Sequence, residues 1–205
     1  MTTARDDVLG RIRAVDRTPS APIERSYRRS GSLGSAERLE LLAARVADYR
    51  AEVHRVTAVA DATAEACRSH HASRLAIPPG LPAAWRAAAL ELVEDDDLSA
   101  GELDAVDGVI TGCTAAIAET GTIILSGGES EGRRALSLVP DLHICVVRPS
   151  QVVELVPEAL ALLDPRRPLT LISGPSATSD IELSRVEGVH GPRTLVVLIV
   201  NEEGP

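Results

Sequence analysis

The stretch that most constrains the fold of this chain is residues 108–128, in which two apolar runs, 109–110 and 123–125, flank a short segment bounded by glycines. Apolar runs this short are typical of buried strands in a sheet. Glu119 lies in the segment between them, among small residues. An ionisable group at this place is either part of a functional site or a carboxylate that caps nearby backbone N–H groups.

The composition excludes several classes of protein. At 205 residues, the chain has the length of one medium domain with a sizeable core. Aromatic residues make up 1% and the net charge is −9, so the chain lacks both the stacking rings and the basic face that nucleic acid requires. All 21 basic residues are arginine, which excludes a Walker A lysine, Schiff-base chemistry and pyridoxal phosphate.

The cysteines and the acidic run favour a protein without a metal centre. Cys67, Cys113 and Cys145 are far apart and odd in number, so we expect reduced thiols and no iron–sulfur cluster on this chain. We expect residues 95–97, three consecutive aspartates, to form a solvated turn, because their side chains diverge. No signal peptide and no apolar run of membrane-spanning length is evident, so we expect a cytoplasmic protein.

Short apolar runs alternate with helical patterns along most of the chain. The expected strands are 51–58, 74–77, 92–93, 107–111, 122–126, 143–148, 169–173 and 194–200. The expected helices are 35–50, 60–72, 82–90, 100–105, 114–119, 133–139, 151–163 and 180–186. This alternation predicts an α/β domain with a mostly parallel sheet. The two runs within 108–128 are so close that a local antiparallel pair, and hence a mixed sheet, is expected.

The first 35 residues differ from the rest. A weak helical pattern over 4–17 is followed by a stretch rich in proline, serine, glycine and arginine. We therefore expect an N-terminal arm or linker over 1–35, partly flexible, and one domain over 36–205.

Three loops have the chemistry of a binding site, and ligands of open α/β sheets collect beyond the carboxyl ends of the strands. The first loop contains Thr111 and Gly112 and leads to Glu119, Thr120 and Gly121. Its candidate ligand-binding residues are Thr111, Gly112, Thr120 and Gly121. Glu119 is the candidate general base or covalent nucleophile, and its alternative is a carboxylate bonded to neighbouring N–H groups. We expect the three loops to line one cleft.

The second loop, residues 173–180, follows an expected strand and opens an expected helix. Its candidate ligand-binding residues are Ser173, Gly174, Ser176, Thr178 and Asp180. Glycine permits close backbone approach, and free N–H groups at a helix start favour an anion. The alternative is simple capping, with Ser179 and Glu182 forming a capping box.

The third loop contains Gly188, His190, Gly191 and Arg193 just before the last strand. A neutral histidine between glycines can accept or donate a proton near pH 7. Its alternative role is to order the loop through a backbone hydrogen bond. Arg193 either meets a carboxylate or faces solvent. These considerations make His190 a candidate catalytic residue and the other three candidate ligand-binding residues.

Two further residues have a possible site role and a structural alternative. Cys113 lies at an expected helix N-terminus, which would favour a thiolate, although small buried cysteines are common in cores. His143 is expected at a strand edge in a structural role.

Several motifs, in order, resemble the LUD (lactate-utilisation) domain family, in its LutC/YkgG branch. They are Ile110-Thr-Gly-Cys-Thr-Ala-Ala-Ile-Ala-Glu-Thr-Gly-Thr-Ile, Arg134-Ala-Leu-Ser-Leu-Val-Pro, His143-Ile-Cys-Val-Val, Ile172-Ser-Gly-Pro-Ser-Ala-Thr-Ser-Asp-Ile-Glu and Gly188-Val-His-Gly-Pro-Arg. The resemblance covers about residues 36–200. It implies a three-layer α/β fold with a mixed, mostly parallel sheet flanked by helices, like that of the NagB/RpiA/CoA-transferase group.

The resemblance also implies a role in oxidising L-lactate to pyruvate together with iron–sulfur partner proteins. Because cluster-binding cysteines are absent, this chain would be a non-redox subunit whose cleft binds a small anion or an unidentified cofactor. One alternative is a stand-alone enzyme, similar to a CoA-transferase or a sugar-phosphate isomerase, that uses Glu119. Another is a regulatory module that senses a ligand.

Overall fold

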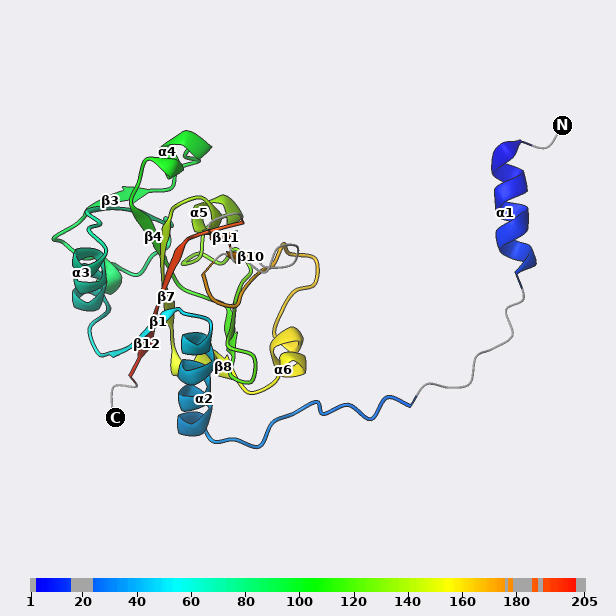
Figure 1. Ribbon diagram of the computed structural model, residues 1–205, viewed down its shortest axis with the longest axis horizontal. Helices are drawn as coiled ribbons and strands as arrows, with labels where there is room; N and C mark the ends of the chain where they lie inside the picture. The colour runs from blue at the N-terminus through cyan, green and yellow to red at the C-terminus, as the bar shows by residue number, and fades with distance from the viewer. Residues whose placement is uncertain (1–2, 16–23, 176, 179–185, 188–189, 202–205) are drawn as a thin grey trace.

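A six-stranded sheet forms the centre of the protein, seen in a computed structural model that describes residues 3–15, 24–175, 177–178, 186–187 and 190–201 (Figure 1). In spatial order its strands are β1 (Glu52–Val56), β12 (Thr194–Val200), β7 (Leu142–Val147), β4 (Gly108–Thr111), β2 (Arg74–Ile77) and β3 (Glu91–Glu94). All five neighbouring pairs are parallel.

The central strands are apolar on both faces. All six residues of β7 are buried, as are the five central residues of β12. Strands buried on both sides by helices or a second layer are typical of parallel sheets. On one face, Ile144, Val146 and Leu198 pack with Cys67 of α3 (Val59–Ser69) and with Trp85.

The opposite face of the parallel sheet packs against α2 (Ser35–Asp48) and a second sheet. There Cys145, Val147 and Val197 share a core with Leu42 of α2 and with Ile123. The second sheet has the order β8 (Val152–Val153), β5 (Ala115–Ile117), β6 (Thr122–Leu125) and β9 (Thr170–Ile172). The α/β fold class, with a mostly parallel sheet flanked by helices, is therefore confirmed.

The prediction for 114–119 was wrong in its local structure. A helix was expected there, but Ala115–Ile117 is strand β5, antiparallel to β6. Strand β5 is buried on both faces: Ala116 belongs to the core beneath α2, whereas Ala115 and Ile117 pack with Ala159 of α6 (Val156–Ala161). Ala115 and Ile117 share one face while Ala116 faces the other, which is the two-residue period of a strand, whereas side chains two positions apart in a helix point to nearly opposite sides. The antiparallel pair thus lies in the second sheet, and β4 stays in the parallel one.

The helices agree with expectation in part. Helices α4 (Ala100–Asp104) and α5 (Arg134–Leu138) form where they were expected. The segment 82–90 contains only a 3-10 turn, Ala83–Trp85, and the helix expected over 151–163 begins at Val156. Its proline lies in the first turn, where a missing N–H costs no helical hydrogen bond. The helix expected over 180–186 lies outside the described residues, apart from Val186 in a short strand.

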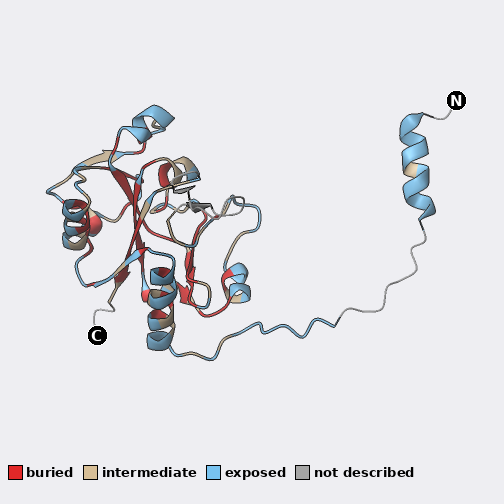
Figure 2. Cartoon of the chain, viewed as in Figure 1, coloured by how far each residue is buried: buried red, intermediate tan, exposed pale blue. Residues whose placement is uncertain are grey.

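The N-terminal arm begins with helix α1 (Ala4–Ala14), which is capped by Thr3 and Asp6 and buries none of its residues (Figure 2). Residues 24–30 form neither a helix nor a strand, and they are exposed. The division into an arm over 1–35 and a domain over 36–205 stays a prediction. Within the described part of the chain, no helix combines the length and apolarity needed to cross a membrane.

Candidate functional site

A pocket of about 240 Å³ lies at the amino ends of β7 and β12, facing strand β9. Four residues predicted from two of the loops line it: Ser173, Gly174, His190 and Gly191. The second and third loops therefore meet at one pocket.

His143, for which a structural role at a strand edge is expected from the sequence, also lines this pocket. It lies instead on β7, between β12 and β4, and is buried. Burial lowers the pKa of its imidazole to about 4, so the ring is neutral at pH 7. Its Nε2 lies 2.8 Å from Oγ1 of Thr111, which connects a predicted ligand-binding residue to the pocket through the imidazole.

Glu119 lies away from the pocket, in the turn 118–121 between β5 and β6. Its side chain is 43% exposed and forms an ion pair with Arg28 of the arm. Its backbone N–H donates to the carbonyl oxygen of Glu154 at 3.0 Å. The carboxylate is thus charge-paired at the surface, and its proposed catalytic role stays a prediction.

The single cleft expected from the three loops is not what forms. The first loop follows β4, and the third precedes β12. Because these strands are parallel, the two loops lie at opposite edges of the sheet. The third loop was expected at the carboxyl ends of the strands, but a loop that precedes a parallel strand lies at the amino ends.

A chain of hydroxyl groups nevertheless joins the Glu119 turn to the pocket wall. Thr120 Oγ1 donates to Thr122 Oγ1 at 2.8 Å, and Thr122 Oγ1 lies 2.9 Å from Ser173 Oγ. Thr122 was not identified from the sequence. Its contact with Ser173 joins positions 51 residues apart, so no local pattern predicts that contact. The Thr-x-Thr pattern of Thr120 and Thr122 could have indicated only the contact between these two hydroxyl groups.

Two predicted glycines occupy tight, left-handed backbone positions. Gly121 has φ +63°, and a Cβ there would lie 2.8 Å from the backbone carbon of Arg45 in α2. Gly174 has φ +89°, and a Cβ added there would lie 2.5 Å from the Cβ atom of Tyr49. Both glycines are therefore required by packing and conformation, whatever their role in binding.

The first loop is held by a buried carboxylate from the segment between β6 and α5, which was not predicted from the sequence. Glu131 accepts hydrogen bonds from Thr114 Oγ1 at 2.6 Å, from the Ser126 N–H at 2.6 Å and from the Gly128 N–H at 3.0 Å. Next to it, the N–H of Gly112 donates to the carbonyl oxygen of Ser130 at 2.8 Å. Glu131 thereby fixes the glycine-rich loop against the end of β4.

Cys113 carries a protonated thiol. Its pKa is raised well above the ordinary value, first by a hydrogen bond with Cys145 and then by burial. A buried thiol of this kind is a poor nucleophile. The structural alternative is therefore the one that the geometry favours.

The remaining predicted residues divide between the surface and the undescribed segments. Arg193 is exposed and bonds to Asp141 at 3.2 Å. Thr178 belongs to the short strand β10 (Ala177–Thr178), which pairs with β11 (Val186–Glu187). Ser176, Asp180 and Gly188 lie outside the described residues, as does the capping box of Ser179 and Glu182.

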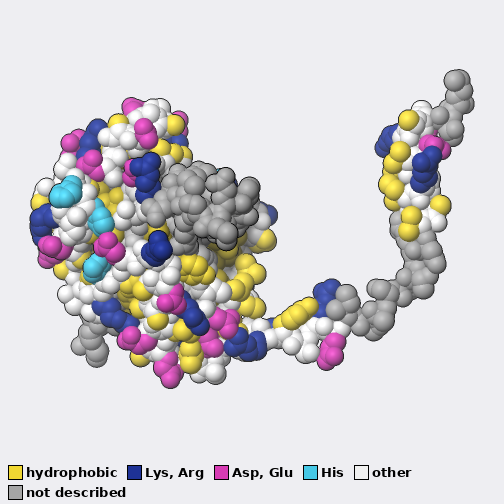
Figure 3. Space-filling model, viewed as in Figure 1, with side chains coloured by type: hydrophobic (Ala, Val, Ile, Leu, Met, Phe, Trp, Pro, Cys, Tyr) yellow, Lys and Arg dark blue, Asp and Glu magenta, His cyan; other side chains and the backbone are white. Residues whose placement is uncertain are grey.

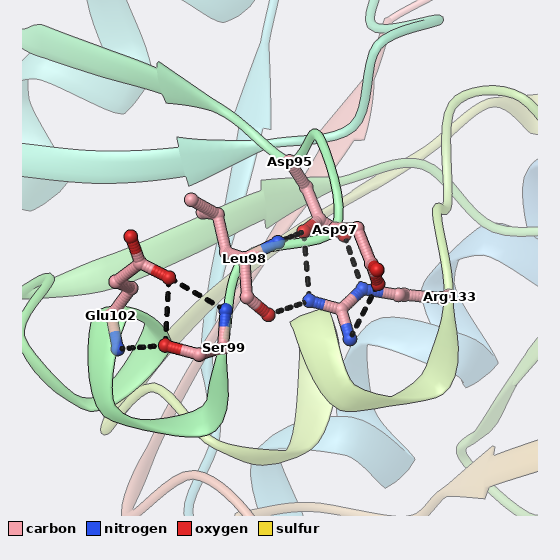
Figure 4. Close-up of polar contacts among 6 residues, drawn as sticks. All are labelled: Asp95, Asp97, Leu98, Ser99, Glu102 and Arg133. Atoms are coloured by element: carbon pink, nitrogen blue, oxygen red, sulfur yellow. Dashed lines mark hydrogen bonds and ion pairs between the residues drawn. The ribbon is translucent and has the colours of Figure 1, made fainter.

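The acidic turn is not simply solvated, as Figure 4 shows. Asp95 is buried and accepts two hydrogen bonds from the Arg133 guanidinium, both at 2.9 Å. It also accepts the Leu98 N–H at 3.1 Å, while Asp97 stays exposed. This pair ties the end of β3 to the start of α5. In the described part of the chain, no cluster of three His, Cys, Asp or Glu side chains could hold a metal ion.

Comparison with known proteins gives consistent relatives. The LUD domain family matches residues 85–200. A protein from Deinococcus radiodurans named lactate utilization protein C is 49% identical over 173 residues, which cover 82% of each chain. A protein of the same name from Bacillus pumilus is 37% identical over 95 residues, or 42% of this chain and 39% of that one.

A solved structure supports the same relationship. The crystal structure of a DUF162 family protein from Deinococcus radiodurans has a TM-score of 0.71 and 41% sequence identity, and the match covers 83% of this chain and 100% of that one. The family match extends over more than half of the chain, and the 49% identical relative aligns along most of its length. The chain therefore belongs to the LUD domain family.

Proposed function

We propose that this protein acts in lactate utilisation, as a non-redox component that binds a small anion in the pocket at the amino ends of β7 and β12. The observation that carries the role is the relative named lactate utilization protein C, which is 49% identical over 82% of both chains. Identity of this extent favours a shared role.

The pocket has the size and chemistry for a small hydroxy acid or keto acid. Its volume of about 240 Å³ lies just below the usual range for drug-sized ligands. Ser173 brings a hydroxyl, Gly174 and Gly191 bring accessible backbone, and the imidazoles of His143 and His190 bring hydrogen-bonding nitrogens. The neutral His143 can donate to or accept from a ligand without a permanent charge. L-lactate and pyruvate are the ligands that this proposal names.

The redox step is assigned to partners. All three cysteines of this chain are buried, and the thiol of Cys113 is held in its protonated form. In this proposal, iron–sulfur proteins of a cytoplasmic lactate-utilisation system carry the electrons, and the LUD chain associates with them.

A growth experiment tests the role. The gene of the relative in Deinococcus radiodurans would be deleted, and this protein would be expressed in its place. We expect growth on L-lactate to be lost in the deletion strain and restored by this protein, with growth on glucose unchanged in both. A deletion strain that grows normally on lactate would contradict the role. Affinity purification of the restored strain tests whether iron–sulfur proteins co-purify.

Binding experiments separate the pocket from the Glu119 turn. Titration calorimetry with L-lactate and pyruvate should show binding that is weakened at least about tenfold by Ser173→Ala or His143→Leu, a loss of about 1.4 kcal/mol. Glu119→Gln should leave the affinity unchanged, because Glu119 does not line the pocket. If the purified protein instead turns over a substrate and Glu119→Gln abolishes that turnover, the alternative of a stand-alone CoA-transferase-like or isomerase-like enzyme would replace this proposal.

A further inference from the structure

Most of the large hydrophobic side chains that are exposed in the described residues gather in two places. The first group, here called the α1 stripe, consists of Val8, Ile12 and Val15, which are 54–64% exposed. The second group, here called the α6 patch, consists of Val156 and Leu160 of α6 and of Leu162 at its C-cap, which are 38–61% exposed. Clustered exposed apolar side chains mark sites of interaction, whereas single ones do not.

The α1 stripe has the geometry of a docking helix. Its residues are spaced by four and three positions, so they lie along one side of α1 and its C-cap, and Figure 3 shows hydrophobic side chains along α1. The helix has only 11 residues and buries none of them. Isolated helices of this length are marginal in water, so α1 would gain stability by covering an apolar surface.

The root of the arm is fastened beside the α6 patch. The Gly31 N–H donates to Glu158 Oε1 at 3.0 Å, and the N–H groups of Ser32 and Leu33 donate to Glu154 Oε2 at 2.6 and 2.7 Å. Glu158 lies in α6, two residues before Leu160. The arm therefore leaves the domain next to the surface that we consider as its docking site.

Gly31 is required for this fastening. A Cβ at Gly31 would lie 2.0 Å from Oε2 of Glu154, which the arm covers. The Gly31 N–H is also the largest cause of the lowered pKa of Glu158, which keeps that carboxylate charged. The fastening is thus a set of charge-assisted hydrogen bonds, which are stronger than neutral ones.

We propose that this protein self-associates by arm exchange, with the α1 stripe of one copy packed on the α6 patch of a second copy. Within one chain, α1 buries no residue and the α6 patch is bare. Each copy carries both an α1 stripe and an α6 patch. A dimer with two-fold symmetry therefore covers both stripes and both patches. The 12 residues of positions 16–27, which precede the contact between Arg28 and Glu119, can extend over about 40 Å, which is enough to reach a neighbouring domain.

Light scattering on the full chain tests the stripe. We expect the protein to have twice its chain mass of 21.6 kDa at micromolar concentration. Ile12→Glu should raise the dimer dissociation constant at least tenfold. Gly10→Glu is the matched control, because Gly10 lies on the opposite side of α1 with open space around it, and it should leave the dimer intact. A chain that is monomeric without substitution, or a dimer unaffected by Ile12→Glu, would overturn the proposal.

A second pair of variants tests the patch. Leu160→Glu should weaken the dimer as Ile12→Glu does, whereas Ala161→Glu, at the neighbouring exposed position of α6, should not. Circular dichroism of both variants establishes that the domain is folded. Equal effects of the two substitutions would contradict a specific contact at the α6 patch.

A cysteine pair distinguishes the possible occupants of the patch. The native cysteines are all buried, so Ile12→Cys combined with Leu160→Cys introduces the reactive pair. Oxidation should give a covalent dimer on non-reducing gels. A disulfide within one chain would show that α1 covers its own domain, and failure of both to form would show that α1 does not bind the patch; either result overturns arm exchange.

Discussion

The pocket and the Glu119 turn differ in the burial and in the charge of the ionisable side chain that each contains. The pocket contains a buried, neutral imidazole, whereas the turn presents a carboxylate that is 43% exposed and paired with Arg28. The most recognisable motif of the chain thus runs through a surface turn, and the pocket lies at another edge of the sheet. A recognisable motif in a sequence therefore marks a candidate residue, whereas the pocket that could hold a ligand forms only when the layers of the fold pack together.

The largest expected effect concerns His143 and pH. Its pKa is about 4 in the folded state and about 6.5 when unfolded, so the unfolded state binds more protons between these values. Protonation of His143 should therefore not affect the free energy of unfolding above pH 6.5. As the pH drops from 6.5 towards 4, it should lower that free energy by up to about 3 kcal/mol. Urea unfolding of wild type and His143→Asn at pH 7 and pH 4.5 measures this, and equal pH dependence in both would contradict it.

The second effect concerns the turn. Gly121→Ala should lower the free energy of unfolding by about 2 kcal/mol, because the new Cβ meets the backbone of Arg45 and φ is +63°. Thermal and urea unfolding measure the loss. Gly10→Ala in α1 is the control, since open space and a helical position make alanine neutral or slightly stabilising there. A neutral Gly121→Ala would show that the turn relaxes freely.

The third effect concerns the link between the two regions. Thr122→Val should cost about 1 kcal/mol of stability, because Ser173 and Thr120 each lose a hydroxyl partner. It should also weaken anion binding in the pocket, since Ser173 is then less firmly oriented. Thr122→Ser should restore both. If Thr122→Val changes stability alone, the hydroxyl chain does not orient the pocket wall.

The smallest effect concerns the Arg28–Glu119 pair. Exposed ion pairs contribute about 0–1 kcal/mol, so Arg28→Ala and Glu119→Gln should barely change the unfolding midpoint. The double variant should behave like either single one, because both remove the same contact. A larger effect would show that the arm supports the domain through this pair.

Much of the fold followed from patterns within short segments. The apolar runs that became β4, β7 and β12 predicted buried strands, and their alternation with helices predicted a parallel sheet. Helix α4 likewise formed where it was expected, and its capping box of Ser99 and Glu102 is encoded within four residues. Strand β5 was mistaken for a helix, because three small apolar residues fit either structure until both faces are known to be buried.

The candidate site was predictable only in its parts. Ser173, Gly174, His190 and Gly191 were identified by their loop chemistry and do line one pocket. His143, Thr122 and Glu131 were missed or misassigned, because their contacts join positions distant in the sequence or lie in a loop without a known signature.

By itself, the sequence determined the fold class, the family motifs and the absence of lysine chemistry, since hydrophobic period, turn residues and residue types are local properties. Only the tertiary structure decided which loops share a pocket, because strand direction sets the edge at which each loop lies. It also decided that Glu119 pairs with the arm and that His143 is neutral. Both depend on burial and on neighbours that the packing of the two sheets brings together.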